Sequence, residues 1–265
     1  LAPGLNRQGS MLIAHASDFS GDDASAFLHA AALTRNGARL VTLHAGPEER
    51  VPADASELAA RWGRPIEHEL HRVDLEDDVS DSLLEPLQRL RPDLVVVGTH
   101  ARHGFAAWLH DSVGEAIARN LCVPVLVVPN QSRGFVEPHS GTVDLRRVIV
   151  PAGNAGDARK AVAAAQFLAR IAESLVELEI VHAGPIDPDL ERLGPTVQRI
   201  DGSLDDAIVA AARARDACLI VMATRGHDAV GDVLRGSHTE RVIREARCPV
   251  LSVPDRWLVS GAAVT

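Results

Sequence analysis

Short apolar runs recur along the chain, and each has the length of a β-strand. In the first half they cover residues 11–16, 38–45, 93–98 and 123–129, and the alternating segment 66–73 is a candidate for one more strand. Helix-like segments separate them: one opens at Ser20, Asp22 and Asp23 and closes near Asn36 and Gly37, one lies around Pro86, over Ser80–Leu90, and one covers 112–120. Strands that are apolar throughout and alternate with helices predict a parallel sheet covered on both faces.

The pattern of the first half recurs in the second half. The block Val97–Pro129 aligns without a gap with Met222–Pro254, and "LHAGP" at 43–47 recurs as "VHAGP" at 181–185. We therefore predict two domains, a first copy over residues 11–130 and a second copy over 146–256, joined by a Gly-, Pro- and Ser-rich linker over 131–145. Each is expected to be a doubly wound α/β domain with a five-stranded parallel sheet flanked by helices.

Composition narrows the class of partner to small molecules and proteins. The formal net charge is −9, aromatic residues make up 3% of the chain, and Tyr is absent. Nucleic acid favours a basic surface and aromatic stacking platforms, so it is not expected as a partner. The apolar runs are too short for membrane insertion. No secretory signal pattern is present, and Cys122, Cys218 and Cys248 are widely spaced, so we expect a cytoplasmic protein with reduced thiols. Residues 1–10 are polar and are expected to flank the fold.

Two common phosphate-binding signatures fail in this sequence. Ligands of doubly wound sheets lie at the carboxyl ends of the strands, where the strand order reverses. No two glycines are separated by one residue, which excludes the dinucleotide fingerprint. Gly226 and Gly231 have P-loop spacing, but Asp232 and Val233 stand where Lys and Ser or Thr are required.

Several motifs of the chain resemble the universal stress protein family in its tandem form, and the resemblance covers both copies. They are "HASDFS" after the first strand, "LHA" at the end of the second, "VVVGTHARHG" and "IVMATRG", a Gly-Ser pair before the last helix, and the closing "CPVLSVP". The resemblance implies a strand-to-helix turn that holds ATP, with the pattern Gly, two residues, Gly, nine residues, Gly and Ser or Thr. Glycines let backbone amides approach phosphate oxygens closely, and a helix N-terminus attracts anions.

Each copy departs from the family pattern at a different place. In the second copy Ala223 replaces the first glycine and Asn154 replaces the acid that contacts the nucleoside in the family, while Gly226, Gly236 and Ser237 fit. In the first copy Asp18 and Gly98 fit, but Ala101 and Asp111 replace the other two glycines, and the Asp111 carboxylate would repel phosphate. We therefore expect ATP, with or without Mg²⁺, in the second copy only. The expected binding residues are Pro151, Ala152, Gly153, Asn154, Val181, Met222, Ala223, Arg225, Gly226, Gly236, Ser237, His238 and Thr239.

Plainer interpretations of the same residues stay open. Ser112 and Ser237 each precede a Glu by three positions, which is a capping box, and the glycines of the pattern also suit ordinary turns. His100, His103 and His110 match no standard metal spacing, so no metal site is expected. His15 and Asp18 suggest acid–base chemistry, but no nucleophile accompanies them, so no catalytic residue is expected.

The leading hypothesis is a stress or regulatory protein that binds an adenine nucleotide without dedicated catalysis. The alternatives are a nucleotide-free interaction scaffold in which both sites have decayed, and a slow ATPase. In single-domain relatives the last strand pairs two domains, so "PVLVVP" and "PVLSVP" are expected to pair within this chain as a pseudo-dimer. A further homodimer and a regulatory protein partner are compatible with the sequence.

Overall fold

The computed structural model describes residues 10–17, 23–35, 37–45, 54–74, 79–99, 123–130, 132, 134–185, 188–201, 204–224, 242, 245 and 247–257. The first copy contains strands β1 (Leu12–Ser17), β2 (Arg39–Ala45), β3 (Glu67–Val73), β4 (Leu94–Thr99) and β5 (Val125–Pro129), with helices α1 (Ala24–Ala32), α2 (Ala55–Trp62) and α3 (Val79–Leu90). The helix expected over 112–120 lies outside the described residues.

The second copy repeats this order of elements. Its strands are β6 (Leu145–Pro151), β7 (Val176–Ala183), β8 (Thr196–Ile200), β9 (Leu219–Thr224) and β10 (Val250–Pro254). Its described helices are α6 (Ala155–Ile171), α7 (Pro188–Glu191) and α8 (Leu204–Ala214). No helix in the described part of the chain is both long and apolar enough to cross a bilayer.

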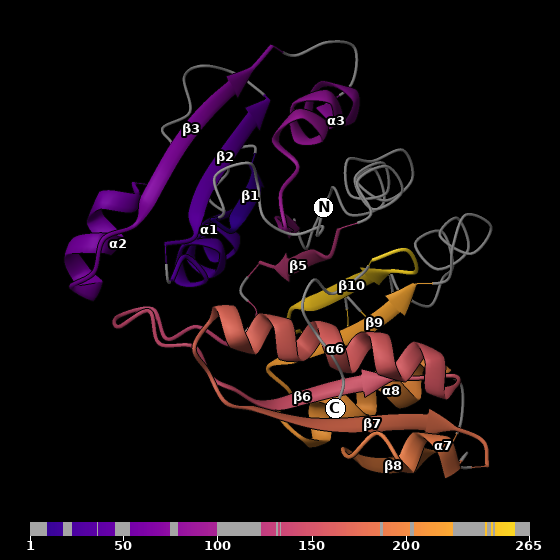
Figure 1. Ribbon diagram of the computed structural model, residues 1–265. Coiled ribbons are helices and arrows are strands. Elements are labelled where there is room, and N and C mark those ends of the chain that lie inside the picture. Colours follow the sequence, from indigo (N-terminus) through magenta and orange to yellow (C-terminus); the bar gives the residue numbers. More distant parts are fainter. Residues whose placement is uncertain are drawn as a thin grey trace.

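All ten strands form one sheet in the order β3-β2-β1-β4-β5-β10-β9-β6-β7-β8 (Figure 1). Strands within each copy are parallel, as the apolar pattern predicts, and β10 pairs antiparallel with β5. Leu126 lies opposite Leu251, and Val127 and Val125 lie opposite Val250 and Ser252. Because these residues occupy matching positions in the two copies, a local twofold axis passes between Leu126 and Leu251. The pairing expected of the two closing strands is therefore made inside the chain.

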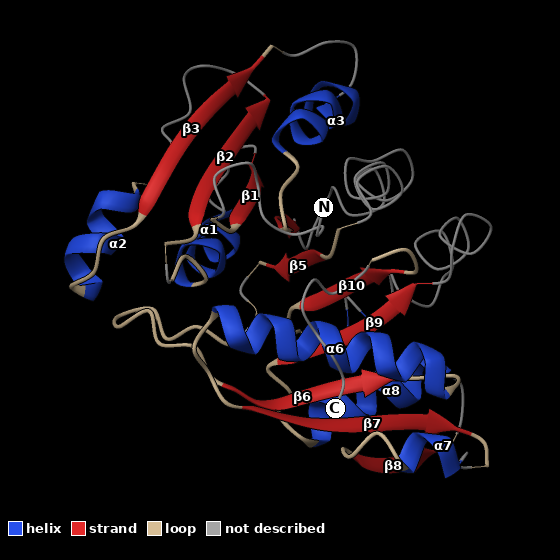
Figure 2. Cartoon of the chain, viewed as in Figure 1, coloured by secondary structure: helices blue, strands red, loops and turns tan. Residues whose placement is uncertain are grey.

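Helices cover both faces of this sheet, as Figure 2 shows. One hydrophobic cluster joins α1, α2, α6 and α7 to one face and includes Phe27, Leu58, Leu168 and Leu190. A second cluster joins α3 and α8 to the other face through residues such as Leu87 and Ile208. Successive strand residues alternate between the two clusters, which is why the strands read as continuous apolar runs.

Two helices of the first copy bear on the expectation for this region, and one of them, α3, confirms the helix expected over Ser80–Leu90. Helix α2 was not expected, although its ends carry clear signals: the Asp54 side chain accepts the Ser56 amide at 2.8 Å, and Gly63 follows in the left-handed region with φ 63°. Helix α3 continues through Pro86. Leu83 and Leu87 are almost fully buried on either side of that proline, so packing on the sheet outweighs its cost.

The segment that follows the first copy packs against α1 and α2 before it enters β6. The Trp62 Nε1 donates to the Pro138 carbonyl at 3.0 Å, and the Phe135 ring meets the His29 ring edge-on at 4.6 Å. A Cβ added to Gly134 would lie only 1.8 Å from His29 Nε2, so glycine is required where this segment crosses the histidine. The linker is thus anchored to the helical layer.

One buried polar atom lies at the junction of the two copies. Ser252 in β10 is 5% exposed, and its hydroxyl has no hydrogen-bond partner among the described residues. Val127 occupies the matching position of β5. We expect Ser252→Val to raise the free energy of unfolding by about 1 kcal/mol, because it removes an unsatisfied hydroxyl and adds apolar packing. Chemical denaturation measures this, with Val127→Ser as the reciprocal variant that should be destabilised; a less stable Ser252→Val protein would contradict the argument.

The buried His29 makes stability depend on pH. Desolvation lowers its pKa to about 4, although the ring lies 2.7 Å from the Ser25 carbonyl oxygen. The unfolded chain therefore binds this proton first as the pH falls, and the stability present above pH 6.5 is lost towards pH 4, by up to about 3 kcal/mol. Chemical denaturation at several pH values across this range measures the effect. The free energy of unfolding should fall more steeply with decreasing pH for the wild type than for His29→Gln, whereas an equal fall in both proteins would show that His29 does not cause it.

Candidate functional site

The strand order reverses between β1 and β4 in the first copy and between β6 and β9 in the second. These are the positions where a doubly wound sheet binds ligands. We call the carboxyl ends of β1, β2 and β4 the first edge, and those of β6, β7 and β9 the second edge. The β1–β4 ladder extends to Ala16 and Val97, whereas the β6–β9 ladder ends at Ile149 and Ile220. The last residues of β6 and β9 therefore do not pair with each other at the second edge.

Four of the expected binding residues lie where β6 turns into α6. Pro151 ends the strand, Ala152 is buried, and Gly153 is exposed at the turn. Asn154 is the N-cap of α6: its Oδ1 accepts the Asp157 amide at 2.9 Å, and its Nδ2 donates to the Asp157 carboxyl group at 2.7 Å. Asn154, which replaces the acid that contacts the nucleoside in the family, thus caps α6 at the second edge.

The second strand of the second copy holds this turn in place. Val181 is 1% exposed, and its carbonyl accepts the Ala152 amide at 3.0 Å. The buried His182 ring places Nδ1 2.8 Å from the Ala152 carbonyl oxygen and Nε2 3.0 Å from that of Pro185. His44, its counterpart in the first copy, lies 3.0 Å from the Ser17 carbonyl oxygen in the same way. These histidines hold neighbouring strand ends together.

The remaining expected residues divide into two groups. Met222 and Ala223 are half-buried at the end of β9, where Ala223 pairs with Val253 of β10. The other members of the set lie outside the described residues: Arg225, Gly226, Gly236, Ser237, His238 and Thr239. Of the first copy's motif, Gly98 is described in β4, while Asp18, Ala101 and Asp111 lie outside the described residues.

A buried acid occupies the first edge. Asp23, the N-cap residue of α1, is 7% exposed and accepts a hydrogen bond from Ser17 Oγ, and its Oδ1 lies 3.2 Å from His15 Nε2. A Cβ added to Gly98 would lie 2.7 Å from that same Oδ1. The glycine that the sequence places at the start of the nucleotide motif therefore makes room for a side chain of the protein itself.

Further polar groups extend from His15 across the sheet. His15 Nδ1 lies 3.4 Å from Thr42 Oγ1, which lies 2.9 Å from His68 Nε2 on β3. Burial, and then the nearby His15, lower the pKa of His68. The Phe27 ring contacts both histidine rings, at 5.6 and 5.4 Å. This row of polar side chains lies between the sheet and α1.

Sequence reasoning linked His15 with Asp18 and assigned Asp23 only to the start of a helix. In the structure the described acid beside His15 is Asp23. A signal was present for His15, Ser17 and Thr42, because they are polar positions on one face of otherwise apolar strands, but not for His68, whose strand is mostly polar. Within the described ranges, no three His, Cys, Asp or Glu side chains gather in a way that would hold a metal ion.

The contact between Gly98 and Asp23 can be tested by a double-mutant cycle. We expect Gly98→Ala to lower the free energy of unfolding by about 1–3 kcal/mol, because the added methyl group meets the Asp23 carboxyl group. In an Asp23→Ala background the same substitution should cost at least about 1 kcal/mol less, which measures the coupling of the two sites. Ala223→Gly is the matched control in the second copy and should show no dependence on Asp23; an equal Gly98→Ala cost in both backgrounds would contradict the steric assignment.

Comparison with known proteins agrees with this architecture. The sequence model of the Universal stress protein family matches residues 59–129 and 189–254, just over half of the chain. A universal stress protein of Thermus aquaticus, encoded in the QAH/OAS sulfhydrylase 3′ region, is 48% identical over 54 residues. That match covers 20% of this chain and 39% of the Thermus protein, so the chain spans about two fifths of the curated relative that it matches.

Solved structures share the fold over nearly the whole chain. A universal stress protein from Archaeoglobus fulgidus superposes with a TM-score of 0.63 at 19% identity, covering 92% of this chain and 96% of that protein. A protein described as a putative universal stress protein, from Pseudomonas aeruginosa, gives a TM-score of 0.58 at 15% identity, covering 92% of each chain. With one family match in each copy and this fold across both, the chain belongs to the universal stress protein family.

Proposed function

We propose that this chain binds ATP at the second edge and acts as a regulatory protein without dedicated catalysis. The proposal takes from the sequence the elements of a phosphate cradle, namely Gly226, Gly236 and Ser237 at the family spacing. Glycines at such a turn allow amides to approach phosphate oxygens, and the helix that follows Ser237 would present its N-terminus. Ala223, one methyl group larger than glycine, stands at the first position of the motif.

The observation that carries the proposal is the difference between the two edges. In the first copy the carboxyl group of Asp23 lies over Gly98, held by Ser17 and His15. A phosphate at that place would displace this group or meet its charge, which is unfavourable inside a buried site. In the second copy Pro151 and Gly153 stand where the first has His15 and Ser17, and the pairing of β6 with β9 ends early. The second edge therefore suits a nucleotide better.

The role of Asn154 sets how strongly a nucleotide is held. Both ends of its amide are engaged with Asp157. A nucleoside that uses Asn154 must share these hydrogen bonds, so the affinity in this proposal comes mainly from the phosphate side. This supports weak to moderate binding of an adenine nucleotide. A nucleotide-free scaffold and a slow ATPase are the outcomes that the experiment separates from it.

Titration calorimetry with ATP, with and without Mg²⁺, tests the proposal. We expect one ATP per wild-type chain, loss of binding in Gly236→Asp because a carboxylate then faces the phosphates, and unchanged binding in Asp18→Ala, which alters the first copy only. Phosphate release measured on the same samples should stay at background. Absence of binding in the wild type would favour the scaffold, turnover would favour the ATPase, and loss of binding only in Asp18→Ala would place the nucleotide in the first copy.

A further inference from the structure

Lys160, the only lysine of the chain, joins two elements of the second copy through an ion pair. It lies on the second turn of α6, the helix that starts after β6 and packs on β9 and β10. Its Nζ is paired with the carboxylate of Asp255, which directly follows β10. The Lys160 ammonium group therefore lies at the carboxyl ends of β9 and β10, next to the second edge.

The ion pair stands beside the start of the proposed phosphate turn. Pro254 at the end of β10 pairs with Thr224 at the end of β9. Asp255 is the next residue of one strand, and the turn begins at Arg225, the next residue of the other. Neighbouring strands lie about 4.8 Å apart, so about one strand spacing separates the backbone of Asp255 from the beginning of the turn.

The pair is exposed enough for Lys160 to exchange its partner. The side chains of Lys160 and Asp255 are 36% and 45% exposed, and ion pairs at such exposure contribute little to stability. The segment that carries Asp255 has other contacts with the fold. The Trp257 ring meets the Phe167 ring of α6 edge-on at 5.5 Å, and the Trp257 amide donates to the Pro254 carbonyl at 3.0 Å. Lys160 can therefore leave Asp255 while this segment stays on α6.

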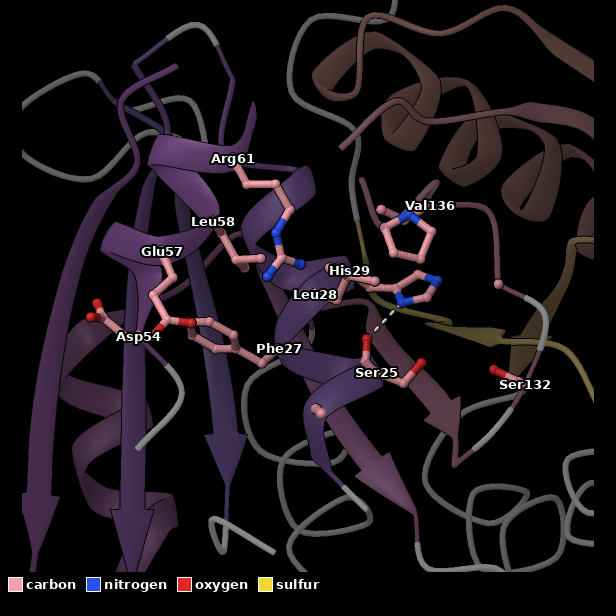
Figure 3. Close-up of a pocket in the computed structure, with 13 residues that line it drawn as sticks. Ser25, Phe27, Leu28, His29, Asp54, Glu57, Leu58, Arg61, Ser132 and Val136 are labelled. Atoms are coloured by element: carbon pink, nitrogen blue, oxygen red, sulfur yellow. Dashed lines mark hydrogen bonds between the residues drawn. The ribbon is translucent and has the colours of Figure 1, made fainter. Parts of the chain in front are cut away.

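The first copy has neither charge at the matching places. His29 lies six residues after the N-cap of α1, as Lys160 does after the N-cap of α6. Figure 3 shows the His29 ring hydrogen-bonded to the Ser25 carbonyl group. Burial lowers the pKa of His29 to about 4, so the ring is neutral at pH 7. Asn130 follows β5 where Asp255 follows β10. The charged pair is thus specific to the copy to which ATP is assigned.

We propose that Lys160 is a phosphate-binding residue of the second edge, and that it leaves Asp255 when the phosphates of a nucleotide occupy the turn. This inference rests on the proposed function, because it assigns one more residue to the same site. Backbone amides of a glycine turn carry no net charge, so Lys160 supplies the neutralising charge. An ammonium group on a flexible stem is a point charge that can follow the phosphates. Without nucleotide, Asp255 holds this charge beside the turn.

Calorimetry with ATP, adenosine and inorganic tripolyphosphate tests the assignment. Lys160→Gln should weaken ATP and tripolyphosphate about tenfold and leave adenosine unchanged, because the lost hydrogen bond goes to a charged group that adenosine lacks. Lys160→Arg keeps the charge and should restore most of the ATP affinity. Arg159→Gln is the matched control, since this exposed neighbour on α6 carries the same charge, and it should bind ATP like the wild type.

Asp255→Asn distinguishes phosphate binding from a purely structural pair. It should strengthen ATP binding at least about twofold, because the phosphates no longer compete with a carboxylate for Lys160. A loss of ATP affinity as large as that of Lys160→Gln would show that the pair only holds the segment after β10, and would overturn the inference. Melting temperatures of all variants show that they are folded.

The remaining outcomes separate this inference from the proposed function. Equal ATP affinity of the wild type and Lys160→Gln would overturn the inference and leave the nucleotide site in place. A wild type that binds tripolyphosphate through Lys160 but does not bind ATP would support the inference and contradict the proposed function. Failure to bind either ligand would overturn both.

Chemical modification gives a second readout, because Lys160 is the only lysine. Saturating ATP or tripolyphosphate should protect Nζ from acetylation by acetic anhydride, whereas adenosine should not. Mass spectrometry of the peptide that contains Lys160 measures the rate. An unchanged rate in protein saturated with ATP would contradict a contact between Lys160 and the phosphates.

Discussion

The antiparallel pairing of β5 with β10 is the interaction on which the rest of the molecule depends. Each copy alone would leave its closing strand as an apolar sheet edge, which is prone to pair with other chains. The pairing that places Leu126 opposite Leu251 gives both closing strands a hydrogen-bonded neighbour and merges the two sheets into one. The same pairing reverses the strand direction across the junction, so the carboxyl ends of β4 and β9 face opposite ways. The first edge and the second edge therefore lie at opposite ends of the strands, and residues at one can differ without affecting the other.

Because the two edges are separate, a few matched positions are enough to give them different chemistry. His15 and Ser17 are matched by Pro151 and Gly153, and Gly98 by Ala223. The first set supports a buried acid, since His15 and Ser17 hold Asp23 and Gly98 leaves space for it. The second set removes the partners of such an acid and places the methyl group of Ala223 where the first copy has Gly98. The substitutions are thus coupled, because keeping either half of the first set alone would leave a polar group unpaired or a clash.

The sheet could be predicted from the sequence because each apolar run is a local signal of a strand, and the duplication repeats most of these signals in the second copy. Helix α2 was missed because only Ala55 and Leu58 are buried in it, so its apolar pattern is weak although Asp54 and Gly63 mark its ends. The Asp23 network was missed because it depends on tertiary pairing: the register of β1 with β2 places Thr42 opposite His15, and the pairing of β2 with β3 brings His68 within reach of Thr42. The contacts of the linker with α1 and α2 could not be predicted at all, since its sequence is that of an ordinary polar connection.

The linker does more than connect the copies, and its contacts explain why. Trp62 and His29 hold it by a hydrogen bond and an edge-on ring contact, and the Arg35 guanidinium donates to the Gly141 carbonyl at 3.1 Å. The bridge between Val136 and Val143 closes the segment just before β6 begins at Leu145. The chain therefore enters β6 from a position fixed by α1 and α2, and β6 ends at Pro151, three residues before Asn154 at the second edge. One continuous run of residues thus joins the helical layer formed by α1 and α2 to the strand that leads to the proposed nucleotide contacts.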